Sequence, residues 1–158
     1  MIKIQLVDDE PNILTSLQRL LRSYPLEVHA FSDVREALQA LTEHEYAVII
    51  SDYKMPSLDG ITYLQFVKQR QPDAVRMVIS GHGDRQAMMA AINRAEIFRF
   101  LSKPWEEDEV KTALKAAIDL HQQRISKQHN KVQDRILGMH EAAKSSLSED
   151  DSNESGHG

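Results

Sequence analysis

The sequence contains no cysteine, which excludes disulfide bonds, thiolate zinc sites and cysteine nucleophiles. No apolar stretch approaches the roughly 20 residues that a membrane span needs. No signal peptide precedes the first apolar run, which begins at Ile2, and we therefore expect a cytoplasmic protein. No internal repeat is present, and 158 residues are enough for one domain with a full hydrophobic core.

Basic residues are missing from the C-terminal end. Residues 145–158 contain four acids and no lysine or arginine, so they contribute −4 of the formal net charge of −5. The rest of the chain is nearly neutral, which does not favour nucleic-acid binding. Serine, acidic residues and glycine dominate the same segment, and such a composition cannot build a core. We expect residues 145–158 to be a disordered acidic tail.

Short apolar runs alternate with helical patterns five times before residue 120. The run Ala47–Ile50 is apolar at consecutive positions, which is typical of a strand buried on both faces, and it leads to Asp52. Strands are predicted over residues 2–7, about 27–31, 47–52, 75–79 and 98–101. Helices are predicted over residues 11–21, 33–44, 61–71 and 85–95, and from about 106 onward. This order predicts an α/β fold with a doubly wound, five-stranded parallel sheet and helices on both faces.

The last predicted helix continues into a polar segment without proline. Four apolar residues are spaced by seven, as in a coiled coil: Ile118, Ile125, Val132 and Met139. The positions three further on are less apolar: His121, Gln128, Arg135 and Ala142. We expect a helical extension of the last helix over residues 121–144, either as a solvated helix or as the seam of a homodimer.

Polar groups follow the ends of four predicted strands: Asp8 and Asp9, Asp52, Ser80, and Lys103. The carboxyl ends of parallel strands meet at one edge of a sheet, so residues far apart in the sequence become neighbours there. Three crowded carboxylates repel one another unless a cation compensates their charge. A hard divalent ion with oxygen ligands, such as Mg²⁺, suits this set of acids.

The combination favours phosphoryl chemistry. A carboxylate beside a divalent cation can attack a phosphoryl group, which makes Asp52 the candidate nucleophile. The Lys103 ammonium would neutralise phosphoryl oxygens, and the Ser80 hydroxyl could donate a hydrogen bond to one of them. Taken singly, each group has an ordinary explanation, because the acids suit turns or helix caps and Ser80-Gly81 is a common turn. Their occurrence together at successive strand ends is far more specific.

Four motifs surround these residues: Leu6-Val7-Asp8-Asp9-Glu10-Pro11, Ser51-Asp52-Tyr53-Lys54-Met55-Pro56 with Asp59-Gly60, Ser80-Gly81, and Lys103-Pro104-Trp105. Together they resemble the receiver domain of two-component response regulators over about residues 2–120. The resemblance implies a flavodoxin-like strand order of 2-1-3-4-5 and a phosphorylation-activated regulator of a phosphorelay. It also implies that residues 1–120 form the receiver domain, ahead of the helical extension and the tail.

The same resemblance assigns roles to individual residues. Asp52 would accept a phosphoryl group from a histidine kinase or a phosphotransfer protein. Asp9, Asp52 and the carbonyl of Lys54 would bind Mg²⁺, with Asp8 acting through water. Lys103 would contact the acyl phosphate, and its peptide bond to Pro104 would be cis.

A switch is implied as well. Ser80 would move toward the phosphoryl group and leave space for Phe100 to turn inward, which would alter the face made by the fourth helix, the fifth strand and the last helix. Phe100 could instead be an ordinary core residue. Lys54 and His82 occupy positions that tune hydrolysis in the family, although a neutral loop histidine without a role is the favoured interpretation of His82.

The output of such a switch is not encoded in a second domain, because neither a helix-turn-helix nor the clusters of a cyclic-dinucleotide enzyme occur. The leading hypothesis is an interaction module, not an enzyme, that contacts an unknown downstream protein or dimerises through its last helix. One alternative is the receiver part of a longer regulator with an output domain such as a cyclic-dinucleotide phosphodiesterase. A small magnesium-dependent phosphohydrolase is disfavoured because Lys54 stands where that class needs an acid/base aspartate. A nucleotide or flavin module would need a glycine-rich loop where Asp8 and Asp9 stand.

Overall fold

The computed structural model describes residues 1–81 and 83–154. His82, which was predicted to tune hydrolysis, and residues 155–158 of the predicted tail lie outside the described residues. Contacts along the backbone divide the chain into two units between Gln122 and Gln123. The first unit holds the sheet, and the second consists of the later part of the last helix.

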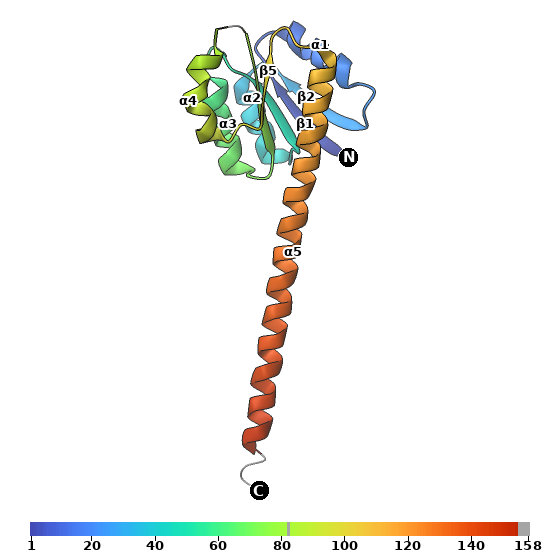
Figure 1. Ribbon diagram of the computed structural model, residues 1–158, viewed down its shortest axis with the longest axis vertical. Coiled ribbons are helices and arrows are strands. Elements are labelled where there is room, and N and C mark those ends of the chain that lie inside the picture. The colour runs from blue at the N-terminus through green and yellow to red at the C-terminus, as the bar shows by residue number, and fades with distance from the viewer. Residues whose placement is uncertain (82, 155–158) are drawn as a thin grey trace. The chain divides into compact units, whose positions relative to one another are not determined.

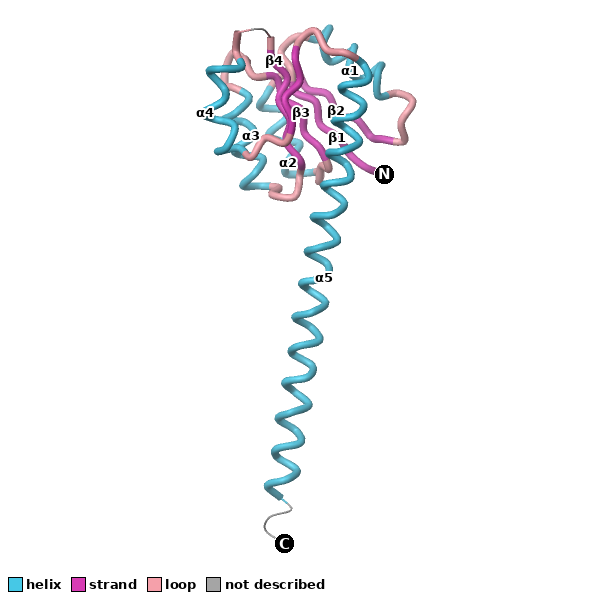
Figure 2. Tube along the Cα trace, viewed as in Figure 1, coloured by secondary structure: helices cyan, strands magenta, loops and turns pink. Residues whose placement is uncertain are grey.

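The first unit is built on five parallel strands in the order β2-β1-β3-β4-β5. The strands are β1 (Ile2–Val7), β2 (Leu26–Phe31), β3 (Val48–Asp52), β4 (Val75–Ser80) and β5 (Arg99–Ser102). The helices are α1 (Pro11–Leu21), α2 (Val34–Glu43), α3 (Gly60–Arg70), α4 (Arg85–Ala95) and α5 (Glu107–Glu154). Figure 1 shows the alternation along the chain, and Figure 2 shows the strands as one layer between helices. The predicted doubly wound α/β fold and its flavodoxin-like strand order are confirmed.

The sheet has a separate hydrophobic core on each face. On one face α1 contributes Leu14, Leu17 and Leu21, and the start of α5 contributes Val110 and Leu114. On the other face α2, α3 and α4 supply a second cluster, which includes Ala37, Leu41, Tyr63, Leu64 and Met88. Every residue of β3 is buried, because the strand is central and covered on both sides. The consecutive apolar residues of this strand are the consequence of that double burial.

Local sequence explains where several helices begin. Pro11 occupies the first turn of α1, where backbone N–H groups have no partner within the helix, so the lack of an N–H in proline costs nothing. The carboxylates of Asp33 and Asp59 accept hydrogen bonds from the backbone N–H groups of Arg35 and Thr62, and so cap α2 and α3. Gly60 approaches β3 so closely that a Cβ atom there would overlap the carbonyl oxygen of Asp52. The loop after β3 therefore depends on a glycine at this position.

Some predicted details differ from the structure. β2 begins at Leu26 and β5 spans Arg99–Ser102, each shifted by one residue from the expected start. Phe66 is an apolar residue of α3, yet half of its surface is exposed. It lies on the outer side of α3, whereas Tyr63, Leu64 and Val67 are on the side that faces the core.

The last helix is longer than the sequence pattern indicated. Its backbone continues to Glu154, beyond residue 144 and into the segment expected to be a disordered tail. No glycine or proline occurs between residues 139 and 155, so no residue in that stretch forces the helix to end. Ile118 belongs to the first unit, where it packs against the α1–α5 core. The predicted division into receiver, extension and tail stays a prediction.

Beyond the first unit, α5 carries a row of exposed apolar side chains. At least about half of the surface of each is accessible: Ile125, Val132, Ile136, Leu137 and Met139. Among the helices as far as they are described, none is long and apolar enough to cross a membrane.

Candidate functional site

The candidate site lies at the carboxyl edge of the sheet, where β1, β3, β4 and β5 end. β1 ends at Val7 and is followed by Asp8 and Asp9, while β3 ends at Asp52 itself. β4 ends at Ser80, and Lys103 follows the last residue of β5. The backbone N–H of Lys103 donates a hydrogen bond to the carbonyl of Ser80 at 2.8 Å, which joins the ends of these two strands. The parallel topology thus brings the residues predicted at the strand ends to one edge.

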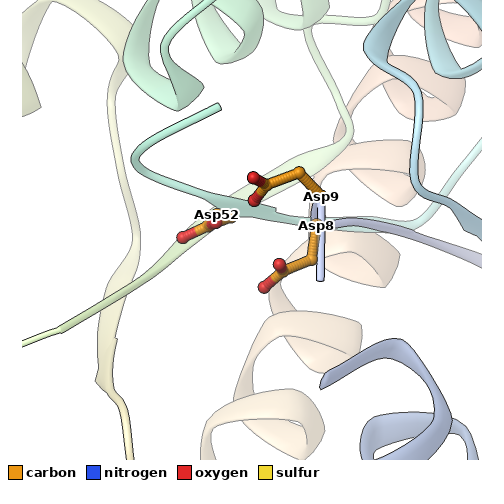
Figure 3. A group of neighbouring side chains, drawn as sticks. All are labelled: Asp8, Asp9 and Asp52. Carbon is orange, nitrogen blue, oxygen red and sulfur yellow. The ribbon is translucent and has the colours of Figure 1, made fainter. Parts of the chain in front are cut away.

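Three carboxylates form the acidic part of the site. Asp8, Asp9 and Asp52 each place a carboxylate oxygen within 4.8 Å of the other two. Figure 3 shows these three side chains near one another. Asp8 and Asp52 are buried, whereas Asp9 is exposed. Carboxylate oxygens are the ligands that hard divalent cations prefer. The donor set therefore fits Mg²⁺, and an ion bound there would relieve the repulsion among the three acids.

Lys103 is the cation that the chain itself supplies. Its Nζ lies 2.9 Å from Oδ2 of Asp8 and 3.1 Å from Oδ1 of Asp52, and only 16% of its side chain is exposed. Glu10 is a more distant partner at 3.9 Å, and sequence reasoning did not find it. Burial by itself would lower the pKa of Lys103, but hydrogen bonds and charge from Asp8 and Asp52 outweigh it and raise the pKa. Lys103 is therefore held as an ammonium between two acids.

Asp52 is the most perturbed acid of the group. Burial and the negative charge of Asp8 raise the pKa of its carboxyl from 3.8 to about 7, although Lys103 acts in the opposite direction. The Lys103 ammonium therefore does not offset the combined effect of burial and the Asp8 charge on the pKa of Asp52. A buried carboxyl with a strongly raised pKa, next to a specific charged partner, is a feature typical of functional sites.

Ser80 and Phe100, the two residues predicted to move in the switch, lie at the end of β4 and on β5. The Ser80 hydroxyl is buried and has no hydrogen-bond partner within the part of the chain that the structure describes. A buried hydroxyl without a partner costs folding free energy unless another group arrives to accept a hydrogen bond from it. Phe100 lies on β5 and is half-buried, with the guanidinium carbon of Arg85 5.7 Å from the centre of its ring. Its side chain is therefore neither a fully buried core residue nor free in solvent.

Two residues of the loops that follow β3 and β4, Lys54 and Asp84, contact each other near the site. The Lys54 side chain extends outward and forms an ion pair with Asp84, with Nζ 3.0 Å from Oδ1. The peptide bond between Lys103 and Pro104 is cis, as the resemblance implied. Asp84 was missed by sequence reasoning, because nothing in the order of residues pairs it with Lys54. The only local signal was its position just before a helical pattern.

A doubly wound parallel sheet with three acids and a lysine at its carboxyl edge defines a class of phosphoryl-accepting signalling domains. The model of the response regulator receiver domain matches residues 4–115 of the chain. The chain therefore belongs to this family: it is the receiver domain of a two-component response regulator, which is activated by phosphorylation. Receiver domains bind Mg²⁺ at an acidic pocket, accept phosphoryl groups from histidine kinases and are in general signalling domains rather than enzymes.

Curated relatives include transcriptional regulators of several bacteria. The chain is 33% identical over 118 residues to the hydrogenase transcriptional regulatory protein HoxA of Bradyrhizobium diazoefficiens, covering 75% of this chain and 24% of that protein. It is also 33% identical over 115 residues to the transcriptional regulatory protein FixJ of the same organism, covering 73% of this chain and 56% of FixJ. The chain thus spans about a quarter of the length of the first relatives.

Solved structures support the same family. The signal receiver domain of an HD domain-containing protein from Pseudomonas fluorescens Pf-5 is similar with a TM-score of 0.75 and 36% identity. The similarity covers 79% of this chain and 92% of that one. NtrX from Brucella abortus matches with a TM-score of 0.74 and 25% identity over 81% of this chain and 30% of that one. None of these similarities supports the small phosphohydrolase that the sequence left as an alternative.

Proposed function

We propose that Asp52 is the phosphoacceptor of this receiver domain. The observation that carries the proposal is the position of its carboxylate, which lies 3.1 Å from the Lys103 ammonium and beside Asp8 and Asp9. In the transfer, a carboxylate oxygen of Asp52 forms a bond to phosphorus. The bond between phosphorus and the donor's histidine nitrogen breaks, and the electron pair stays on that nitrogen, which takes up a proton.

The acidic group is proposed to hold the metal during this step. Asp9, Asp52 and the carbonyl of Lys54 would bind Mg²⁺, and Asp8 would act through water. The donor set supports this assignment, because three carboxylate oxygens within 4.8 Å leave a charge that a single lysine does not compensate. A bound Mg²⁺ supplies charge neutralisation to the phosphoryl oxygens.

Lys103 and Ser80 are proposed to hold the product. The Lys103 ammonium already contacts Asp52 and would remain beside the new phosphoryl oxygens as a charge-assisted donor. The buried Ser80 hydroxyl is free to donate a hydrogen bond, and an oxygen of the aspartyl phosphate would accept it. A movement of Ser80 toward that oxygen would open space for Phe100 and so alter the face formed by α4, β5 and α5.

The return to the resting state requires attack of water on the same phosphorus, with the Asp52 carboxylate as leaving group. We propose that Lys54 and His82 tune this hydrolysis, as their positions after Asp52 and Ser80 suggest. The phosphodonor would be a histidine kinase or a phosphotransfer protein. A downstream protein would recognise the altered face.

A homodimer through α5 is proposed as a second mode of interaction. The exposed apolar residues of α5 after residue 122 favour it, because Ile125, Val132 and Met139 repeat every seven residues. Ile136 and Ala143 follow Val132 and Met139 by four residues, which supplies the second apolar position of the repeat. A second copy of the chain could cover this row.

The phosphoacceptor assignment is tested by incubating the protein with a small phosphodonor such as acetyl phosphate and Mg²⁺, followed by intact-mass measurement. Wild type should gain the mass of one phosphoryl group, and Asp52→Asn should gain none. Asp119→Asn is the matched control, because it removes one exposed carboxylate from α5 and should be phosphorylated like wild type. Equal phosphorylation of Asp52→Asn and wild type would disprove the assignment.

A further inference from the structure

An ion pair joins the two loops that flank Asp52. Lys54 comes two residues after Asp52, and Asp84 comes four residues after Ser80. Because β3 and β4 are neighbours, both loops leave the sheet at the same edge. The Lys54 side chain is 76% exposed, while only 17% of the Asp84 side chain is exposed. The lysine side chain thus lies largely in solvent, whereas the aspartate side chain is mostly covered.

Asp84 is also the residue that precedes α4, where an aspartate ordinarily caps the helix. Its carbonyl accepts the first helical hydrogen bond, from the N–H of Met88 at 3.1 Å. Its carboxylate, however, makes no capping hydrogen bond to the first turn. Its backbone is helical, with φ −85° and ψ −18°, rather than extended. The capping capacity of Asp84 is therefore unused while its carboxylate contacts Lys54.

Two other helices of the same chain show what Asp84 lacks. Asp33 precedes α2 with an extended backbone, φ −116° and ψ 122°, and its carboxylate accepts from the N–H of Arg35. Asp59 precedes α3 with φ −72° and ψ 156°, and its carboxylate accepts from the N–H of Thr62. Of the three aspartates, only Asp84 forms an ion pair with a residue beside the phosphoacceptor. Asp33 caps α2 although it also forms an ion pair with Arg35, but that partner lies in the same helical turn. The partner of Asp84 lies in another loop, and the uncapped, helical backbone of Asp84 occurs together with that contact.

We propose that Asp84 positions the Lys54 ammonium in the unphosphorylated protein, and that phosphorylation of Asp52 draws Lys54 away so that Asp84 caps α4. The proposal rests on the proposed function of Asp52. It adds Asp84 as a positioning residue, and it makes the first turn of α4 a reporter of the charge on Asp52.

The competition for Lys54 favours the phosphoryl group. The phosphoryl group of an aspartyl phosphate carries about −1.5 to −2 charges at neutral pH, in place of the single charge of the Asp52 carboxylate, whereas Asp84 offers a single negative charge. An ion pair with so exposed a lysine contributes little stability, so a stronger neighbouring charge displaces it readily. Once released, the Asp84 carboxylate lies at the N-terminus of α4, where unpaired N–H groups and the helix dipole favour an anion.

The residue next to Asp84 connects this change of partner to the face formed by α4, β5 and α5. Arg85 is the first residue of α4, and its guanidinium lies over the ring of Phe100. A change of the Asp84 backbone from helical to extended would move the Arg85 side chain relative to that ring. Lys54, Asp84 and Arg85 thus form a path from the site to Phe100 that does not pass through Ser80.

Two substitutions separate the ion pair from the cap. Asp84→Asn keeps a side chain that caps helices well but cannot form an ion pair with an ammonium. Lys54→Met removes the ammonium and keeps an unbranched stem and the backbone carbonyl. Asp119→Asn serves as the matched control, because it makes the same change of charge on the exposed surface of α5. Amide hydrogen exchange of Gln86 and Ala87 in the first turn of α4 is the measurement, with intact mass to report phosphorylation.

In wild type, these two amides should become about fivefold more protected when acetyl phosphate and Mg²⁺ are added, the change expected for a gained cap. Asp84→Asn and Lys54→Met should show that protection already without phosphodonor and should gain little when it is added. Asp119→Asn should behave as wild type. The proposal would be overturned if phosphorylation left the hydrogen-exchange rates of these two amides unchanged in wild type. It would also be overturned if, before phosphorylation, the two amides exchanged in Asp84→Asn and Lys54→Met at the wild-type rate. If wild type gains no phosphoryl mass, the Asp52 assignment fails, and the unphosphorylated variants alone decide whether Lys54 restrains Asp84.

Discussion

The substitution Asp52→Asn should stabilise the metal-free protein at alkaline pH. Burial and the charge of Asp8 raise the pKa of the Asp52 carboxyl to about 7, compared with 3.8 for the same group in solvent. The folded state therefore holds a proton on Asp52 between these two pH values, and the unfolded state does not. As pH rises from about 4 to 7, the free energy of unfolding of wild type should fall relative to that of the variant.

The magnitude follows from the same two pKa values. Each pH unit between these two pKa values corresponds to about 1.4 kcal/mol of stability. The free energy of unfolding of the variant can therefore exceed that of wild type by at most roughly 4 kcal/mol above pH 7. Two effects reduce the stability that the variant gains over wild type. The site is open to water beside the exposed Asp9, and Lys103 loses its charged partner Asp52 in the variant. We expect Asp52→Asn to be about 1–2 kcal/mol more stable than wild type at pH 8. At pH 4 the two proteins should differ little.

The assay is urea denaturation of both proteins at pH 4, 6 and 8, with EDTA and again with Mg²⁺. Mg²⁺ should raise the stability of wild type at pH 8 more than that of the variant, because the ion binds the folded state and needs the ionised carboxylate. Asp119→Asn should follow wild type at every pH. A stability difference between wild type and Asp52→Asn that stays constant across the pH range in EDTA would refute the crowding of charge inferred at this site.

Two further predictions concern the loop after β3 and the last helix. Gly60→Ala should lower the free energy of unfolding by about 1–3 kcal/mol, because a Cβ atom would overlap the Asp52 carbonyl. The control is Gly138→Ala on α5, where the added Cβ meets open space. In the same urea experiment this variant should be neutral or more stable by up to about 1 kcal/mol. Val132→Lys in the full chain should weaken self-association at least tenfold in sedimentation experiments, whereas Lys131→Arg should not. Monomeric wild type at high protein concentration would contradict the α5 dimer.

Much of the fold could be read from the sequence because its signals are local. The apolar residues of β3 are consecutive since both faces of that strand are covered, and Pro11 marks the first turn of α1. The carboxyl ends of parallel strands must share one edge, so placing Asp8, Asp9, Asp52 and Lys103 there needed only the strand ends and the topology. The structure brings these four together, while their chemical roles stay predictions.

Other features depend on distances that no local pattern contains. The outward position of Phe66 follows from which side of α3 meets the sheet. The ion pair of Lys54 with Asp84 joins two loops that are brought together only when β3 and β4 pair. Sequence spacing gives no measure of such a contact.

What the sequence determines by itself is the order of strands and helices and the identity of the acids at the strand ends, because periodicity and strand termini are properties of neighbouring residues. What only the tertiary structure decides is how those groups affect one another. The raised pKa of Asp52, the orphaned hydroxyl of Ser80 and the missing cap of α4 each arise from burial and charge supplied by residues distant in the sequence. Electrostatic free energy depends on separation in space and on access to water, and both are established only when the chain has folded.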